Sequence, residues 1–182
     1  MSVVYSNISV EFVDKMGDDL AVANAARVSF GKEKSELDDG DVKLIKYLAN
    51  HEHTSPFRHT AIKFRCKVPV FLARQLGKHQ VGWSWNEVSR RYVDDGFEFY
   101  LPQNLRKRPD KSIKQGSGDS FDAQANADFQ DIIYLSTLSC VKSYNELLDE
   151  GVAPEQARMV LPQNMMVEWI WTGNLLSAYH LC

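Results

Sequence analysis

The chain has 182 residues, which favours one domain, or two at most, and it is long enough to bury a sizeable core. Its 44% hydrophobic and 25% charged residues are typical of an ordinary globular protein. The net charge of -3 argues against a general nucleic-acid binder, and no apolar run approaches the ~20 residues of a membrane span.

The N-terminal residues and the cysteines predict a cytoplasmic protein. The first twelve residues lack the basic stretch, apolar core and cleavage site of a signal peptide. Three cysteines without paired spacing suit a reducing compartment and argue against a disulfide framework. They are Cys66, Cys140 and Cys182.

Hydrophobic patterning predicts strands and helices in irregular order through the first half of the chain. Apolar and polar residues alternate loosely over 3–13, which predicts a strand. Acidic residues then begin a predicted helix over 18–26. A second helix is capped at 39–41. Clean alternation over 62–68 predicts a half-buried strand, which a helix over 70–80 follows.

The second half begins with a polar, basic stretch over 102–120 that we interpret as a loop. A long helix is expected over 122–150, and Pro154 starts a shorter one. Alternation over 165–171 predicts a strand, and Asn174 caps a last helix. We therefore expect an α+β fold in a single domain over residues 1–182.

The segment 74–92 (RQLGKHQVGWSWNEVSRRY) is rich in polar and charged side chains. Arginine forks suit phosphate, and amide side chains suit the edges of a pyrimidine or flavin ring. The segment therefore predicts a site for an anionic, aromatic ligand, although a polar surface loop beside a core strand is the simpler alternative. Its polar residues are Arg74, Gln75, Lys78, His79, Asn86, Glu87, Ser89, Arg90 and Arg91.

From Ser84 to Tyr92 this segment resembles the signature of the flavin-dependent thymidylate synthases, which reads RHR, two residues, then SxNExSxRY. The resemblance extends in order along nearly the whole chain. Further matching segments are AARVS at 25–29, HTSPFRH at 53–59, the Arg74-Gln75 pair, ARMVLP at 157–162 and WTGN at 171–174.

The resemblance implies the family's own α+β fold, a mixed sheet flanked by helices, and not a Rossmann sheet. It implies transfer of a methylene group from methylenetetrahydrofolate to C5 of dUMP, with FAD as cofactor and reduction by NAD(P)H, giving dTMP. NADPH and the folate are then cosubstrates, and no protein nucleophile is used. A homotetramer with shared active sites is also implied, without nucleic acid or membrane partners.

Individual roles follow the same resemblance. The residues expected to hold FAD are Ser55, Lys78, His79, Gln80, Glu87, Asn174 and His180. Those expected to bind the nucleotide are Gln75, Lys78, Glu87, Val88, Ser89, Arg90, Arg91 and Arg158, the last from a neighbouring subunit. Among them Ser89, Arg91 and Arg158 are the expected catalytic residues.

The chain departs from the family pattern at several positions. Lys78 and Gln80 replace the two signature arginines, so that a planar fork and one charge are lost. One extra residue precedes Ser84, and Arg58 stands where the family has glutamate. A family arginine that contacts the uracil ring is expected beyond Cys182, so the C-terminal end is expected to be truncated.

Other functions remain open at this stage. A dUMP hydroxymethylase, in which water completes the transfer, and a nucleotide-binding homologue without catalysis are the alternatives. A metal site at His51, His53 and His59 lacks partnering cysteines or carboxylates, so we expect none. The basic loop 106–114 is expected to be solvated rather than to bind nucleic acid or a folate tail.

Overall fold

A computed structural model describes residues 3–93 and 96–181 of the chain, which forms two compact units. The strand β3 (Ala61–Pro69), the helix α3 (Val70–Leu76) and the strand β6 (Met166–Gly173) each contribute residues to both. Unit 1 comprises Met1–Ile8, Val68–Ala73 and Val88–Val167, and unit 2 comprises Ser9–Lys67, Arg74–Glu87 and Glu168–Cys182.

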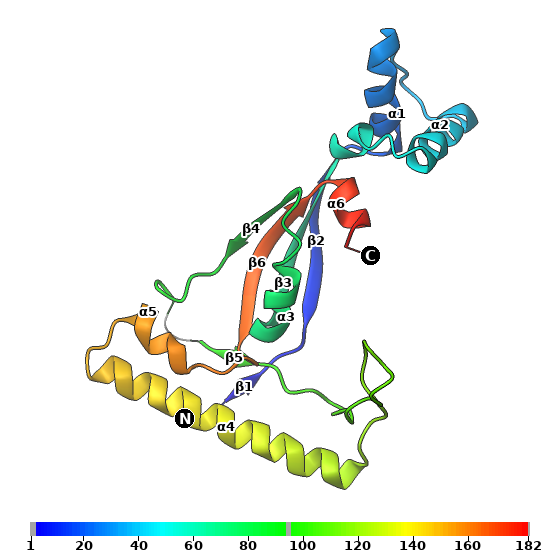
Figure 1. Ribbon diagram of the computed structural model, residues 1–182. Coiled ribbons are helices and arrows are strands. Elements are labelled where there is room, and N and C mark those ends of the chain that lie inside the picture. Colours follow the sequence, from blue (N-terminus) through cyan, green and yellow to red (C-terminus); the bar gives the residue numbers. More distant parts are fainter. Residues whose placement is uncertain (1–2, 94–95, 182) are drawn as a thin grey trace. The chain divides into compact units, whose positions relative to one another are not determined.

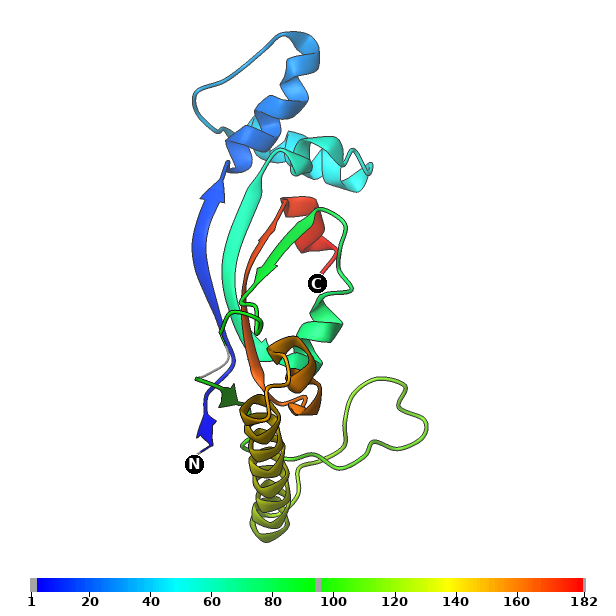
Figure 2. The ribbon, with the colours of Figure 1, turned by 90° about the vertical axis from the view of Figure 1, so that its left-hand side faces the viewer.

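A four-stranded sheet in the order β2-β3-β6-β4 forms the frame of unit 2. Its outer strands are β2 (Ser9–Met16) and β4 (Trp83–Glu87). The strand β2 pairs antiparallel with β3, and β4 pairs antiparallel with β6 (Figure 2). These two antiparallel pairings confirm the expected α+β class, which is distinct from a parallel Rossmann sheet.

The strand β6 carries the core of the sheet. From Val167 onward its residues alternate between buried and half-buried, with Trp169 and Trp171 only 1% and 5% exposed. On β4, Trp83 stacks on Trp171 with ring centroids 4.1 Å apart, and Trp85 stacks on Trp169 with ring centroids 3.8 Å apart. Trp169 and Trp171 are therefore core residues of the sheet.

Three helices complete unit 2: α1 (Asp19–Arg27), α2 (Asp39–Asn50) and α6 (Leu175–Tyr179) (Figure 1). Short helical turns also occur at Val28–Phe30 and Ser55–Arg58. The helix α1 begins as predicted, because Asp18 accepts a hydrogen bond from the Ala21 N–H. The predicted cap of α2 at 39–41 is one residue late, because Asp38 is the N-cap and exchanges hydrogen bonds with Asp41.

Unit 1 is built on the long helix α4 (Ala123–Asp149), capped by Asp122 and close to the predicted bounds. Two short parallel strands, β1 (Val4–Tyr5) and β5 (Glu98–Phe99), form a separate ribbon. The helix α5 (Pro154–Ala157) and the turn Arg158–Val160 pack on α4. In the core of unit 1, the Phe97 ring packs edge-on against Tyr144, which is fully buried.

The segment 102–120 has no helix or strand, as predicted, yet its base is attached to α4. Asn126 of α4 accepts from the Leu105 N–H at 2.7 Å and donates to the Gln103 carbonyl at 2.9 Å. The Gln130 amide donates to the Pro102 carbonyl at 2.8 Å. The basic side chains further along the loop remain exposed.

The structure differs from the predictions in three elements. The single strand over 3–13 is wrong, because the chain pairs first with β5 and then, from Ser9, with β3. The helix after β3 ends at Leu76, and the backbone continues through tighter i to i+3 turns to His79. The strand β4 was not predicted, although Trp83, Trp85 and Glu87 alternate along it.

Candidate functional site

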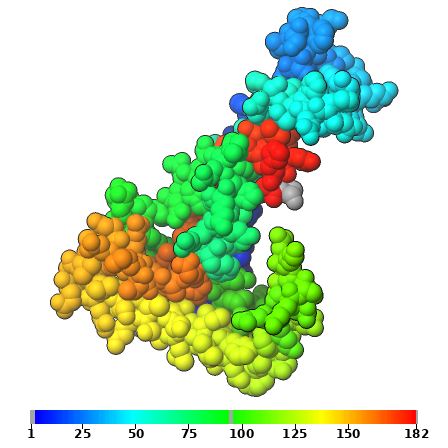
Figure 3. Space-filling model, in the orientation of Figure 1, coloured from blue at the N-terminus to red at the C-terminus, as the bar shows by residue number. Residues whose placement is uncertain are grey.

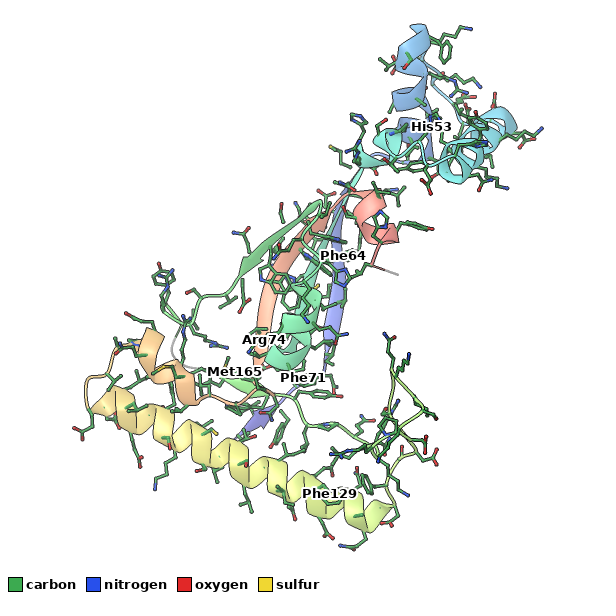
Figure 4. All side chains as sticks on the ribbon, in the orientation of Figure 1. His53, Phe64, Phe71, Arg74, Phe129 and Met165 are labelled. Carbon is green, nitrogen blue, oxygen red and sulfur yellow. The ribbon has the colours of Figure 1, made fainter. Side chains whose placement is uncertain are left out.

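The segment 74–92 passes through four stretches of local structure. Arg74 and Gln75 lie exposed in the last turn of α3 (Figure 4 labels Arg74). Turns over 77–82 lead into β4, and a further turn over 88–93 follows it. Glu87 ends β4 in unit 2, whereas Val88 begins a stretch of unit 1. The residues expected to hold FAD therefore all belong to unit 2.

The Lys78-His79-Gln80 turn presents polar side chains to solvent. The Lys78 N–H bonds to the Gln75 carbonyl at 3.3 Å, and the Gln80 carbonyl accepts from the Trp83 N–H at 3.3 Å. All three side chains of the turn are exposed. Within the described part of the chain, neither Lys78 nor His79 forms an ion pair. An ammonium, an imidazole and an amide are thus available to an anionic ligand.

Gly82 attaches this turn to α6. Its φ of 72° lies in the left-handed region, and its carbonyl accepts from the Asn174 N–H at 3.4 Å. A Cβ at this position would overlap Ser177 Oγ and would lie 2.8 Å from Asn174 Nδ2. Only glycine therefore fits between the turn and the start of α6.

Asn174 caps α6, as predicted. Its Oδ1 accepts hydrogen bonds from the Ser177 N–H and hydroxyl, both at 2.9 Å. The Asn174 oxygen is therefore occupied in helix capping, which leaves its amide N–H groups for a ligand. His180 is the exposed residue that ends the same helix, and Ser55 begins the Ser55–Arg58 turn that packs on α6. The structure thus gathers Ser55, Gly82 and Asn174 around α6.

Glu87 is exposed at the end of β4, and its carboxylate has a defined partner. The Trp85 indole N–H donates to Glu87 Oε2 at 3.1 Å. Sequence reasoning assigned no role to Trp85. The signal that could have identified it is the two-residue spacing from Glu87, which places both side chains on one face of a strand.

The expected nucleotide residues of the 88–91 turn lie in unit 1. Ser89 Oγ accepts from the Arg91 backbone N–H at 3.3 Å and from its Nε at 3.5 Å. The Arg90 guanidinium lies over the Phe97 ring at 4.8 Å and donates to the Val93 carbonyl at 3.5 Å. Arg91 is exposed while Arg90 is half-buried, so Arg91 presents its guanidinium more freely to a phosphate.

Arg158 begins the turn Arg158–Val160 of unit 1 and is exposed. Its Nε donates to the Glu155 carbonyl at 3.3 Å, and its terminal nitrogens form no hydrogen bond with the described residues. Over residues 3–93 and 96–181, no hydrogen bond or ion pair joins Arg158 to Ser89 or Arg91. Gln75 and Lys78, by contrast, belong to unit 2.

Two surface hollows are described in unit 2, and neither contains an expected site residue. One of about 210 Å³ lies along the β2–β3 edge, between Asp14, Lys63 and Thr172. The other, of about 400 Å³, lies between Lys15, Asp18 and Leu37. The candidate side chains are instead presented on exposed turns.

The cysteines are poorly suited to nucleophilic chemistry. Cys66 is 2% exposed on β3, and burial raises the pKa of its thiol, which disfavours the thiolate. Cys140 is half-buried on α4, and Cys182 lies outside the described residues. The described residues include no cluster of three or more His, Cys, Asp or Glu side chains arranged to hold a metal. His51 stacks instead on Tyr47, with ring centroids 4.1 Å apart.

Comparison with known proteins gives a consistent result. The profile of the Thy1 family, described as thymidylate synthase complementing protein, matches residues 11–182. A flavin-dependent thymidylate synthase of Thermus thermophilus is 40% identical over 171 residues, covering 94% of this chain and 61% of that protein. One from Kosmotoga olearia is 42% identical over 168 residues, covering 92% and 72%.

A solved structure is similar along nearly the whole chain. The UMP/dUMP methylase PolB from Streptomyces cacaoi, bound with 5-Br dUMP, superposes with a TM-score of 0.86 at 35% identity. The match covers 99% of this chain and 79% of that one. The same methylase bound with 5-Br UMP gives a TM-score of 0.84. The chain spans about 61% of the length of the Thermus relative.

Proposed function

The chain belongs to the Thy1 family of thymidylate synthase complementing proteins, and we propose that it carries the catalytic segment of a flavin-dependent thymidylate synthase. The reaction is the FAD-dependent transfer of a methylene group from methylenetetrahydrofolate to C5 of dUMP. Reduction by NADPH completes it and gives dTMP. The observation that carries the proposal is the segment 74–92, which exposes Lys78, His79 and Gln80 on the turn before β4 and Arg91 on the turn after it.

FAD fits the residues of unit 2 by the chemistry of its donors. Lys78 and His79 have no carboxylate partner among the described residues, so they are available to the flavin pyrophosphate. The free amide N–H groups of Asn174 and the amide of Gln80 suit flavin ring or phosphate oxygens. Ser55 and His180 complete this set beside α6. Bound FAD would supply the reducing equivalents for the transfer.

The nucleotide is bound mainly by unit 1 in this proposal. Arg91 and Arg158 hold the phosphate, because guanidinium groups pair with phosphate oxygens in a bidentate geometry. Ser89 orients Arg91 through the hydrogen bonds from its backbone N–H and Nε. Further nucleotide contacts are proposed for Gln75, Lys78, Glu87, Val88 and Arg90, as the resemblance to the family implies.

Positioning and electrostatics, rather than a protein nucleophile, provide catalysis. Cys66 is buried with a raised thiol pKa, which supports this assignment. As a bond forms at C5 of the pyrimidine, negative charge develops on the ring, and nearby cationic groups stabilise that charge more in the transition state than in the ground state.

We also propose that the protein works as a homotetramer with shared active sites. Two apolar surfaces support an assembly. The helix α4 exposes Ile132 and Leu135 by 61% and 62%, one turn apart (Figure 3 shows α4 in yellow). The edge strand β2 exposes Val10 and Phe12 by 60% and 61%. Large apolar side chains gathered in this way are typical of protein interfaces. A cytoplasmic location agrees with the proposal, and no described helix is long and apolar enough to span a bilayer.

UMP is a second candidate substrate, because the structurally similar PolB is a UMP/dUMP methylase. The experiment supplies dUMP and UMP separately, with FAD, NADPH and methylenetetrahydrofolate, and identifies the products by mass spectrometry. We expect dTMP from dUMP. A methylated ribonucleotide from UMP would assign the second function instead. A colourless protein that binds dUMP without FAD would identify a nucleotide-binding homologue.

A further inference from the structure

Trp85 and Glu87 form a defined unit on one face of β4. The Trp85 Nε1–H donates to Glu87 Oε2 at 3.1 Å. Side chains two positions apart on a strand share a face, so this bond requires no distortion of the backbone. Glu87 is otherwise exposed, and a glutamate without partners samples several rotamers. The indole therefore selects one orientation of the carboxylate.

The Trp85 ring is itself fixed by the core of the sheet. It stacks on Trp169 with an interplanar angle of 15° and a centroid distance of 3.8 Å. It also meets Trp171 edge-on at 5.9 Å. Because Trp169 and Trp171 are almost fully buried, the rings beneath Trp85 have little freedom to move.

Strand register explains why the indole N–H is directed toward Glu87. In the β4–β6 ladder, Trp85 lies opposite Trp171, and Glu87 lies opposite Trp169. The Trp85 ring stacks on the diagonal neighbour Trp169, so it leans along the strand toward Glu87. Trp83 makes the equivalent diagonal stack on Trp171, but its N–H donates to the Ser177 carbonyl at 3.3 Å.

We propose that Trp85 is a positioning residue, which holds the Glu87 carboxylate in the orientation that binds ligand. The tryptophan stack transmits the rigidity of the sheet core to an exposed side chain at the site. This inference rests on the proposed role of Glu87 in binding FAD and the nucleotide.

A double-mutant cycle with Trp85→Phe and Glu87→Ala tests the proposal. Phenylalanine keeps an aromatic ring on Trp169 but removes the N–H. We expect Trp85→Phe to weaken the binding of FAD or dUMP roughly two- to tenfold in the wild-type background. In the Glu87→Ala background the same substitution should have no further effect, because the group that Trp85 orients is gone.

Two controls separate positioning from loss of packing. Trp171→Phe removes indole area from the same stack but leaves the Trp85 N–H and Glu87 in place, so ligand affinity should stay unchanged. Replacing Trp85 by its benzothienyl analogue keeps the size of the ring and removes only the N–H, and it should reproduce the effect of Trp85→Phe. In protein with isotope-labelled tryptophan, the Trp85 indole N–H resonance should shift in Glu87→Ala.

The outcomes are distinguishable. If Trp85→Phe weakens binding equally in both backgrounds, Trp85 acts through packing and the positioning role is wrong. An unshifted Trp85 resonance in Glu87→Ala would also overturn it. If Glu87→Ala leaves both affinities unchanged, the binding role assigned to Glu87 under the proposed function is wrong instead.

Discussion

The Arg27 guanidinium forms an ion pair with the Asp41 carboxylate, and this pair joins the end of α1 to the first turn of α2. The Asp41 side chain is fully buried, and it also accepts from the Asp38 N–H at 2.9 Å. Lys34 adds a second cation at 3.3 Å. The packing of the α1 and α2 helices in unit 2 therefore depends on a buried charge with several partners.

Removing that charge should destabilise the protein strongly. Asp41→Asn leaves the Arg27 guanidinium without its partner, and breaking a buried ion pair on one side is costly. We expect the melting temperature to fall by roughly 10 °C. Asp38→Asn is the matched control, because asparagine is an equally good N-cap and only an exposed ion pair with Lys34 is lost. Similar melting temperatures for both variants would contradict the importance of the buried pair.

The same carboxylates should make stability depend on acid pH. The Lys34 ammonium and the Asp41 N–H lower the pKa of Asp38 from 3.8 to about 2. Burial alone would raise the pKa of Asp41, but the Asp38 N–H, Arg27 and Lys34 outweigh burial and lower it. Since both pKa values are lower in the folded state, their stabilisation is present above about pH 4 and is lost on acidification, for Asp38 as the pH falls toward about 2.

Urea unfolding at a series of pH values measures this dependence. The double variant Asp38→Asn/Asp41→Asn should be less stable at neutral pH and should lose less further stability on acidification than the wild type. Asp110, whose pKa is lowered by hydrogen bonds from Ser112, should account for part of the remaining slope. Parallel pH profiles for the two proteins would rule out the assigned role of the Asp38–Asp41 pair.

Gly82→Ala should separate the 77–82 turn from α6. The added Cβ would overlap Ser177 Oγ, and the φ of 72° is unfavourable for alanine. We expect a stability loss of roughly 2–4 kcal/mol, and FAD affinity should fall about tenfold or more. Gly31→Ala is the control, since its φ is also positive but no atom lies within 4 Å of the added Cβ. Equal FAD affinity in both variants would show that this turn does not hold the flavin.

Arg158→Ala should weaken the binding of dUMP much more than the binding of FAD. A charge-assisted hydrogen bond to phosphate contributes roughly 1.5–3 kcal/mol, so dUMP affinity should fall about ten- to a hundredfold. Calorimetric titration of each ligand measures the two affinities. Arg108→Ala removes another exposed arginine of unit 1 and should change neither. Equal losses for dUMP and FAD in Arg158→Ala would indicate a folding defect rather than a phosphate contact.

Local signals allowed much of the fold to be predicted. Asp18, Asp122 and Asn174 each cap a helix where the sequence indicated, because a cap depends on a few neighbouring residues. Alternation likewise identified β3 and β6. The break between β1 and β2 depends on a change of pairing partner from β5 to β3, and alternation within 3–13 carries no information about that change.

The candidate residues could be predicted from the sequence, but most of their partners could not. The hydrogen bond between Trp85 and Glu87 could have been inferred had the two-residue alternation of β4 been recognised. The contact of Gly82 with Asn174 and Ser177 joins segments far apart in the chain. The ion pair between Arg27 and Asp41 likewise depends on how α1 packs on α2. Such contacts follow from tertiary packing.

Identification of the reaction product tests the proposed function most directly. The protein is incubated with dUMP, FAD, NADPH and methylenetetrahydrofolate, and the nucleotide is identified by chromatography and mass spectrometry. We predict multiple turnovers to dTMP, lost when FAD, NADPH or the folate is omitted. Recovery of hydroxymethyl-dUMP, or of unchanged dUMP from a protein that binds it tightly, would contradict the assignment as a flavin-dependent thymidylate synthase.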